Sequence, residues 1–106
     1  MDLVVIIYEL IKTFPREETY GLVSQLRRAA ISVASNIAEG AADRTHDQFS
    51  NFLSVAIGSL NEINTRLEAA FRIGYLGKEQ HDAVQAAVVE CLAVTYGLRR
   101  KIKSDS

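Results

Sequence analysis

Hydrophobic residues recur at steps of three or four positions through most of this chain, a spacing that places them on one face of an α-helix. The longest stripe predicts a helix over residues 46–73 and keeps helical spacing for about six turns. Other stripes predict helices over residues 3–12, 18–39 and 78–103. Alternation of period two, which is typical of a strand, never persists. The longest stripe consists of Phe49, Phe52, Leu53, Ala56, Leu60, Ile63, Leu67 and Ala70.

Residues that favour helix ends separate these four segments. Pro15 follows the first, and a proline disfavours helical geometry in the residue before it. Thr45 followed by Gln48 is typical of a capping box at the start of the third helix. Gly40 and Gly74 stand where a left-handed cap is expected after the second and third helices. The short connections favour antiparallel neighbours, so we expect an all-α protein in which residues 1–106 form a single antiparallel up-and-down four-helix bundle.

The first and last helices carry more hydrophobic residues than one bundle interior can bury. In the last helix, residues 83–94 include only Gln85 and Glu90 as strongly polar side chains. Exposed methyl groups on an alanine-rich helix are one explanation, because single exposed apolar residues are normal. We favour a second buried face against another copy of the chain, since both helices show the excess. In the first helix the apolar residues surround the axis: Leu3, Val4, Val5, Ile6, Ile7, Tyr8, Leu10 and Ile11.

Charge and cysteine content narrow the range of partners and compartments. The formal net charge is −1, which argues against strong nonspecific binding to nucleic acid because such binding needs a surplus of Lys and Arg. Cys91 is the only cysteine, so no internal disulfide can form and a cytoplasmic location is expected. The apolar N-terminal stretch contains Asp2 and Glu9 and lacks a basic start, which favours a helix over a signal peptide or a membrane span.

No set of residues predicts catalysis, and we expect no enzyme activity, no metal and no cofactor. His46 and His81 begin different helices, and the acidic residues near them lack the paired spacing of a zinc site. We therefore expect both histidines to be exposed at helix starts. Cys91 lies in an apolar stretch and is interpreted as a packed thiol. The Ser and Thr residues have no evident base beside them.

A cluster of basic residues ends the fourth helix, at Arg99, Arg100, Lys101 and Lys103. Positive charge suits the negative end of a helix dipole, so these residues are interpreted as solvated helix-end side chains. The alternative is a nucleic-acid contact, because a ring of subunits would bring several copies of the cluster together.

A second polar group lies beside the apolar stripes of the second and third helices. We expect these residues to pair across the bundle and fix the register of the helices, and a ligand or nucleic-acid contact is the alternative. An arginine there would need a carboxylate partner, because burying an unpaired charge is costly. The group consists of Gln25, Arg27, Arg28 and Asn36, with Glu39 and Glu62 as the candidate carboxylates.

Two stretches of the sequence are similar to a known bacterial family. They are FPREETYGLVSQLRRAAISVASNIAEG, residues 14–40, and GSLNEINTRLEAAFRIGYL, residues 58–76. They resemble the four-helix bundle family associated with intervening sequences in 23S ribosomal RNA genes, and the string NIAEG after QLRRA is specific. The matching residues are Phe14, Pro15, Glu18, Gly21, Leu22, Gln25, Arg27, Arg28, Ala29, Asn36, Ile37, Ala38, Glu39, Gly40, Ser59, Leu60, Glu62, Gly74, Tyr75 and Leu76.

The resemblance implies a four-helix bundle and a ring of five subunits. The chain is also similar to the accessory protein of diversity-generating retroelements, a basic pentamer thought to contact nucleic acid and a reverse transcriptase. The net charge of −1 departs from that strongly basic pattern. We therefore expect a non-enzymatic homopentameric bundle of unresolved biological role, with a nucleic-acid-binding or ribonucleoprotein accessory factor as the alternative.

Overall fold

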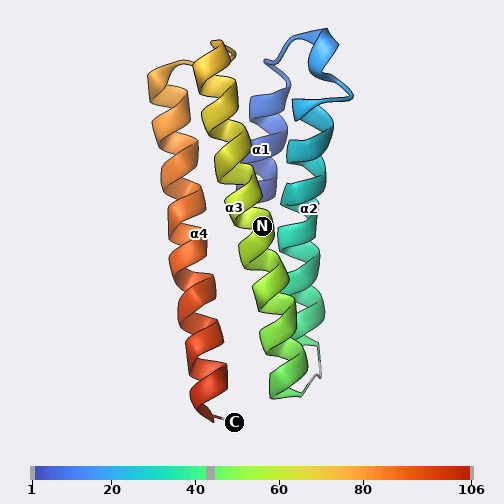
Figure 1. Cartoon of the computed structure of the whole chain (residues 1–106), viewed down its shortest axis with the longest axis vertical. Coiled ribbons are helices and arrows are strands. Elements are labelled where there is room, and N and C mark those ends of the chain that lie inside the picture. The colour runs from blue at the N-terminus through green and yellow to red at the C-terminus, as the bar shows by residue number, and fades with distance from the viewer. Residues whose placement is uncertain (1, 43–44, 106) are drawn as a thin grey trace.

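The computed structural model describes residues 2–42 and 45–105, and these residues form four α-helices and no strand (Figure 1). Successive helices run in opposite directions, which confirms the predicted all-α, antiparallel up-and-down bundle. The described part measures 46 × 23 × 18 Å, and its length suits helices of 28 residues rising about 1.5 Å per residue. The elements are α1 (Asp2–Ile11), a 3-10 helix η1 (Arg16–Glu18), α2 (Leu22–Ala41), α3 (His46–Ile73) and α4 (Lys78–Asp105).

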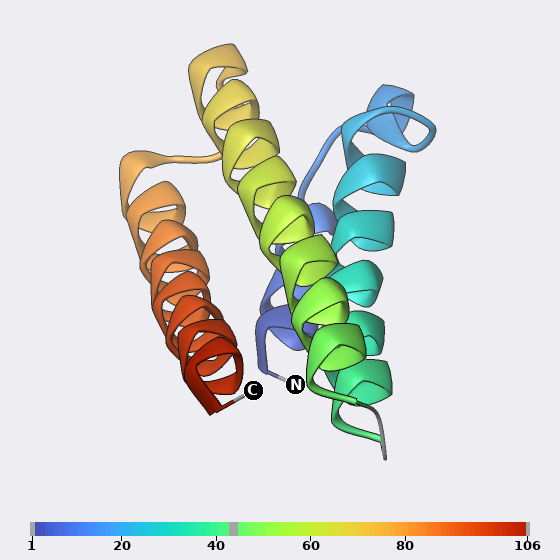
Figure 2. The same ribbon diagram turned by 60° about the horizontal axis from the view of Figure 1, so that its bottom comes forward.

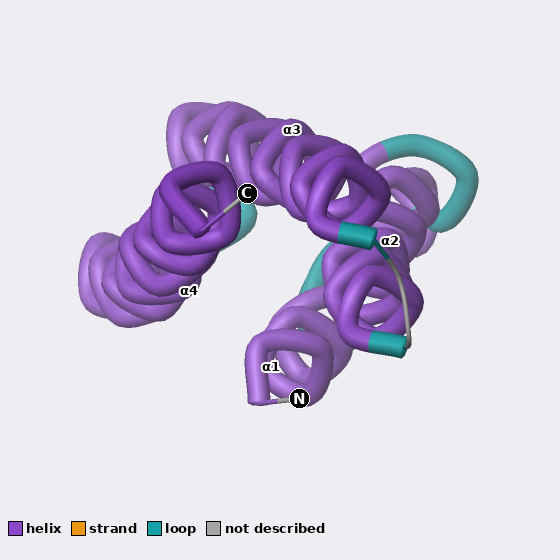
Figure 3. The backbone as a smooth tube through the Cα atoms, turned by 90° about the horizontal axis from the view of Figure 1, so that it is seen from below, coloured by secondary structure: helices purple, strands orange, loops and turns teal. Residues whose placement is uncertain are grey.

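The four helices form an open arc in chain order (Figure 3). α3 packs along both α2 and α4, whereas α1 packs on α2 and touches α4 only sparsely. α1 has 10 residues against 28 in α4, so it accompanies only the upper half of the bundle as drawn in Figure 1. The turned view in Figure 2 shows α3 crossing between α2 and α4. The end of the bundle that holds the start of α3 and the end of α4 is therefore built from three helices.

A core of aliphatic side chains joins the helices. Leu60, Ile63 and Leu67 of α3 are fully buried, as are Leu26 of α2 and Val88 of α4. Steps of three and four keep these residues on one side of each helix. Burial of each such side chain stabilises the fold by about 1.5–3 kcal/mol. The third helix therefore forms where its apolar stripe predicts it.

The predicted ends of α3 are confirmed. Thr45 Oγ1 accepts a hydrogen bond from the Gln48 backbone N–H, and the Gln48 side chain accepts one from the Thr45 backbone N–H, both at 3.2 Å. At the other end Gly74 has φ of 98°, a left-handed conformation that glycine adopts without steric cost. The observed bounds of α1 and α4 lie within two residues of the predicted ones.

Two expectations about α2 are wrong. The helix begins at Leu22 instead of residue 18, because residues 16–18 form the separate turn η1 and the backbone of Gly21 is not helical. Gly40 is not a left-handed cap; it is buried inside α2, which continues to Ala41. A Cβ atom at Gly40 would lie 2.6 Å from Cδ1 of Phe49. Glycine is needed there because the start of α3 crosses close to the end of α2.

Motif residues close the end of the bundle where η1 and the α3–α4 turn meet. The Glu18 carboxylate accepts hydrogen bonds from the Leu22 backbone N–H at 3.3 Å and from the Tyr75 hydroxyl at 2.7 Å. The Tyr75 ring lies against Phe14, with centroids 5.7 Å apart. The Glu18 carboxylate raises the pKa of Tyr75 because it accepts the phenolic proton in a hydrogen bond. These motif residues therefore have a structural explanation, since they hold the turns together.

Candidate functional site

The basic residues at the end of α4 do not form one patch. Successive helical residues are rotated by about 100°, so Arg99 and Lys103 lie about 40° apart, whereas Lys101 lies nearly opposite Arg99. The Arg99 guanidinium faces α3 and donates a hydrogen bond to Ser54 Oγ at 3.1 Å. Lys103 lines the same space between α3 and α4. Arg100 and Lys101 are exposed on other sides of the helix. The structure thus brings together two of the four predicted residues.

Asn36 is part of a polar network that links two helices. Its side-chain amide donates hydrogen bonds to the Ser32 backbone carbonyl at 2.7 Å and to Ser32 Oγ at 3.1 Å. Ser32 Oγ in turn lies 2.8 Å from Ser59 Oγ on α3. All three side chains are half-buried. Hydroxyl and amide groups that satisfy one another across two helices favour one register over others, as expected for this residue.

The predicted pairing of the α2 arginines with Glu62 is wrong. Glu62 pairs with Arg66 of its own helix, at 3.6 Å. Leu26 and Ala30 face the core, which turns Arg27 and Arg28 outward to exposed positions. The Arg27 guanidinium lies over the ring of Tyr8, 5.7 Å from its centroid. The remaining members of the predicted group are the half-buried Gln25 and the exposed Glu39.

Residues around His81 join α3 to α4 in a cluster that sequence reasoning missed. The expectation of an exposed His81 is wrong, because α4 folds back along α3 and leaves this side chain only 6% exposed. Its Nε2 lies 3.1 Å from Glu68 Oε2, and its Nδ1 lies 3.1 Å from Asp82 Oδ1. Its ring stacks on Phe71 with centroids 4.6 Å apart. His46, by contrast, is exposed as predicted.

Cations hold both carboxylates of this cluster in the ionised form. The Arg72 guanidinium, hydrogen-bonded to Glu68 at 3.0 Å, lowers the pKa of Glu68, and His81 adds to the effect. Lys78 lies 2.9 Å from Asp82 and lowers the pKa of Asp82, again with a contribution from His81. The cluster therefore acts as a charged clasp between two helices. The positions of these residues in the sequence do not indicate a cluster, because Glu68 and His81 meet only when α4 lies against α3.

An apolar groove runs between α1 and α4, which lie apart in Figure 3. Two hollows of about 350 and 420 Å³ lie along it, the first beside Leu3 and Ile6 and the second beside Val5 and Leu10. Cys91 lines the first hollow and is half-buried, and burial raises the pKa of its thiol.

Apolar side chains also lie exposed on the two helices that border this groove. Val5 is 61% exposed, Val89 52% and Val94 66%. In α4, Val84 and Val88 face the core while Ala83, Ala86, Val89 and Ala93 are exposed. Helix α4 therefore carries more hydrophobic residues than the core buries, as predicted.

Two kinds of feature are not found in residues 2–42 and 45–105. No three or more His, Cys, Asp and Glu side chains gather there in a way that could hold a metal ion. No helix within these ranges is both long enough and apolar enough to cross a membrane.

The comparisons with known proteins place the chain in a family. No curated protein matches it. A crystal structure of a protein with unknown function, from the S23 ribosomal protein family of Bacteroides thetaiotaomicron VPI-5482, has the same fold, with a TM-score of 0.85 and 24% sequence identity over 92% of each chain. The model of the family described as 23S rRNA-intervening sequence protein matches residues 1–97. This match confirms the family that the motifs in residues 14–40 and 58–76 indicated. The chain therefore belongs to the 23S rRNA-intervening sequence protein family.

Proposed function

We propose that this protein is a non-enzymatic scaffold that assembles with copies of itself through the groove between α1 and α4. The observation that carries the proposal is the exposure of Val5 and Val94, which line the two hollows of that groove. Each Å² of apolar surface removed from water contributes about 25 cal/mol. Apolar residues gathered on one face, instead of scattered singly, are typical of an interaction surface.

The charges around the groove favour another copy of this chain as the occupant. Asp2 and Glu90 line the first hollow and Glu9 lines the second, so the rim is acidic. On α2, Arg28 and Ile31 are three residues apart and both exposed, Ile31 to 45%. Positions three apart share one face of a helix. A basic residue beside an apolar one complements an acidic rim around an apolar groove.

Contact between two different faces of the same chain has a geometric consequence. Head-to-tail interfaces of this kind close into rings or extend into filaments, whereas a symmetric dimer buries the same face twice. A ring is consistent with the five-subunit assembly that the resemblance to relatives implies. We therefore propose a closed ring, with five subunits as the expected number.

Light scattering after gel filtration tests the assembly. The wild-type chain is expected to have several times its monomer mass, and the double variant V5E/V94E is expected to be a monomer with unchanged helical circular dichroism. The matched control is Ile73→Glu, because Ile73 is 58% exposed but lies in the last turn of α3, away from the groove. A monomeric wild-type chain at micromolar concentration would contradict the proposal.

Nucleic-acid binding is a second candidate function, favoured by the four cations in the last two turns of α4, of which Arg99 and Lys103 lie together beside α3. Replacing all four by Ala should abolish RNA binding at low salt without changing the oligomer mass. The control replaces Lys12 and Arg16, two exposed cations near the opposite end of the bundle that take no part in the clasp between α3 and α4. Absence of measurable RNA affinity for the wild-type chain at low salt would exclude this function.

A further inference from the structure

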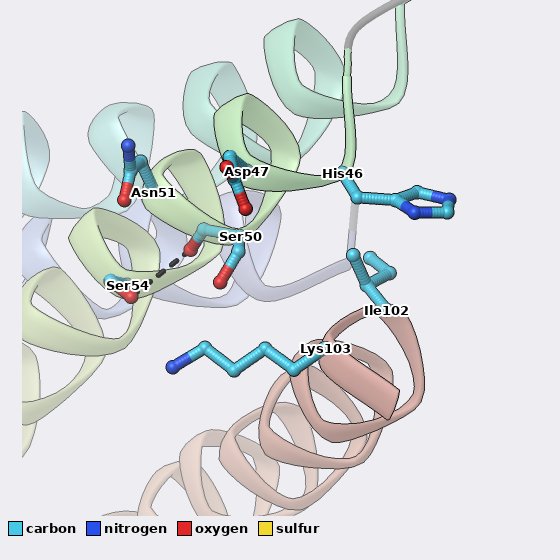
Figure 4. Close-up of a pocket in the computed structure, with 7 residues that line it drawn as sticks. All are labelled: His46, Asp47, Ser50, Asn51, Ser54, Ile102 and Lys103. Carbon is cyan, nitrogen blue, oxygen red and sulfur yellow. Dashed lines mark hydrogen bonds between the residues drawn. The ribbon is translucent and has the colours of Figure 1, made fainter. Parts of the chain in front are cut away.

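A polar pocket lies between the start of α3 and the end of α4 (Figure 4). Its volume is about 370 Å³, which is large enough for an anion with several oxygens. α3 supplies His46, Asp47, Ser50 and Asn51, and α4 supplies Lys103. α1 does not reach this end of the bundle, and all the residues that line the pocket belong to α3 and α4.

Ser50 is a buried polar group whose hydroxyl points into this pocket (Figure 4). Its side chain is only 7% exposed. Its backbone carbonyl accepts a hydrogen bond from Ser54 Oγ at 3.0 Å, but the Ser50 hydroxyl has no partner among the described residues. Most buried side-chain polar atoms are hydrogen-bonded to protein or water. The Ser50 hydroxyl is open to the pocket, so a ligand held there can form a hydrogen bond with it.

The positive charges at the pocket identify the chemistry of that ligand. Lys103 extends along α3 toward Ser54, and the Arg99 guanidinium is held against Ser54 by its 3.1 Å hydrogen bond. The N-terminal end of α3 adds the positive end of a helix dipole, which favours anions. The Ser50 hydroxyl, the Lys103 ammonium in the pocket wall, the nearby Arg99 guanidinium and the helix start form a set suited to an oxyanion.

We propose that this pocket binds a phosphate group, with Ser50 and Lys103 as its donors and with Arg99, which lies outside the lining and bonds to Ser54, adding positive charge. The Asp47 carboxylate also lines the pocket and opposes the binding of an anion. Removal of the Asp47 charge is therefore expected to strengthen phosphate binding, whereas removal of a cation is expected to weaken it. The proposal goes beyond self-assembly and does not depend on it, because one chain supplies every wall of the pocket. The phosphate can belong to a small molecule or to an RNA strand.

Amide chemical shifts during titration with inorganic phosphate test the pocket, and fluorescence anisotropy with a labelled single-stranded RNA oligomer tests the source of the phosphate. Phosphate is expected to shift the amides around Ser50 and Arg99. The double variant R99Q/K103Q should weaken binding by about tenfold or more, Ser50→Ala should weaken it less, and Asp47→Asn should strengthen it. Thermal unfolding of each variant establishes that it is folded.

The matched control is R100Q/K101Q, which removes the same two charges from the other sides of α4 and should leave affinity unchanged. Equal weakening by both double variants would overturn the proposal, because it would reveal general attraction to net charge. Absence of shifts around Ser50 at tens of millimolar phosphate would also overturn it. RNA binding that is lost only in R99Q/K103Q assigns the phosphate to a strand, and phosphate binding without RNA binding assigns it to a small ligand.

Discussion

Gly40 lies in the last turn of α2, where the start of α3 crosses over it. A Cβ atom there would come within 2.6 Å of the Phe49 ring and 3.0 Å of Phe52 Cβ. We expect Gly40→Ala to destabilise the fold by about 1–3 kcal/mol, because ring and backbone must shift to admit the methyl group. The free energy of unfolding from urea denaturation measures the effect.

Gly58 provides the control for this substitution. It is exposed in the middle of α3, and a Cβ atom there would meet nothing within 4 Å. Alanine has the higher helix propensity, so Gly58→Ala should stabilise the protein by up to about 1 kcal/mol. If crowding at Gly40 were unimportant, both Gly40→Ala and Gly58→Ala would stabilise the protein. That outcome would contradict the prediction.

Thr45 caps α3 through its hydroxyl, which accepts the Gln48 N–H. Replacing Thr45 by Ala should cost about 1 kcal/mol of stability, because that N–H loses its partner within the protein. The matched substitution is Thr65→Ala in the same helix, where the exposed hydroxyl only donates to the Asn61 carbonyl. Urea denaturation of T65A should give wild-type stability or slightly more, and a loss as large as that of T45A would contradict the capping role.

At the scale of elements, the clasp between α3 and α4 predicts sensitivity to acid. The pKa of Glu68 lies below its ordinary value of 4.5 and the pKa of Asp82 below 3.8, owing to Arg72, Lys78 and His81. A carboxyl whose pKa is lower in the folded state stabilises the fold above its ordinary pKa, and that contribution is lost as the pH falls through the folded value. The urea midpoint should therefore fall as the pH drops below about 4.5.

The double variant E68Q/D82N separates this clasp from other acid-labile groups. It should be less stable than the wild type at pH 7, because His81 loses both charged neighbours. Between pH 7 and pH 3 its urea midpoint should change less than that of the wild type, since neither replaced side chain titrates. Parallel curves for the two proteins would assign the acid sensitivity elsewhere.

At the scale of the whole molecule, contact between two different faces predicts complementation. V5E/V94E retains the α2 face, and Ile31→Glu retains the groove between α1 and α4. Each variant alone should be a monomer, because ring closure needs both faces on every chain. Mixed in equal amounts, they should form a heterodimer through the one intact pair of faces, visible as a doubled mass in light scattering. A mixture that remains monomeric would contradict head-to-tail assembly.

Much of this fold could be predicted because it depends on local spacing. The stripe on α3, its capping box and the left-handed Gly74 each need only residues within a few turns. The start of α2 could not be predicted in the same way, because Glu18 belongs to a separate turn and bonds to Tyr75 far along the chain. For the candidate site, the sequence indicated the four cations at the end of α4. Only the packing of α4 on α3 shows that Arg99 and Lys103 face α3, whereas Arg100 and Lys101 lie on other sides of the helix.

The sequence by itself determined the helical class, the number of helices, their alternating direction and the family. These depend on apolar periodicity, on helix-end residues and on short connections, all of which are local along the chain. Tertiary structure alone decided that Gly40 faces Phe49, that His81 is buried against Glu68, and that the Ser50 hydroxyl faces Lys103 across a pocket. Each of these pairs joins two helices, and periodicity specifies which side of a helix is buried without specifying which residue of its neighbour it meets.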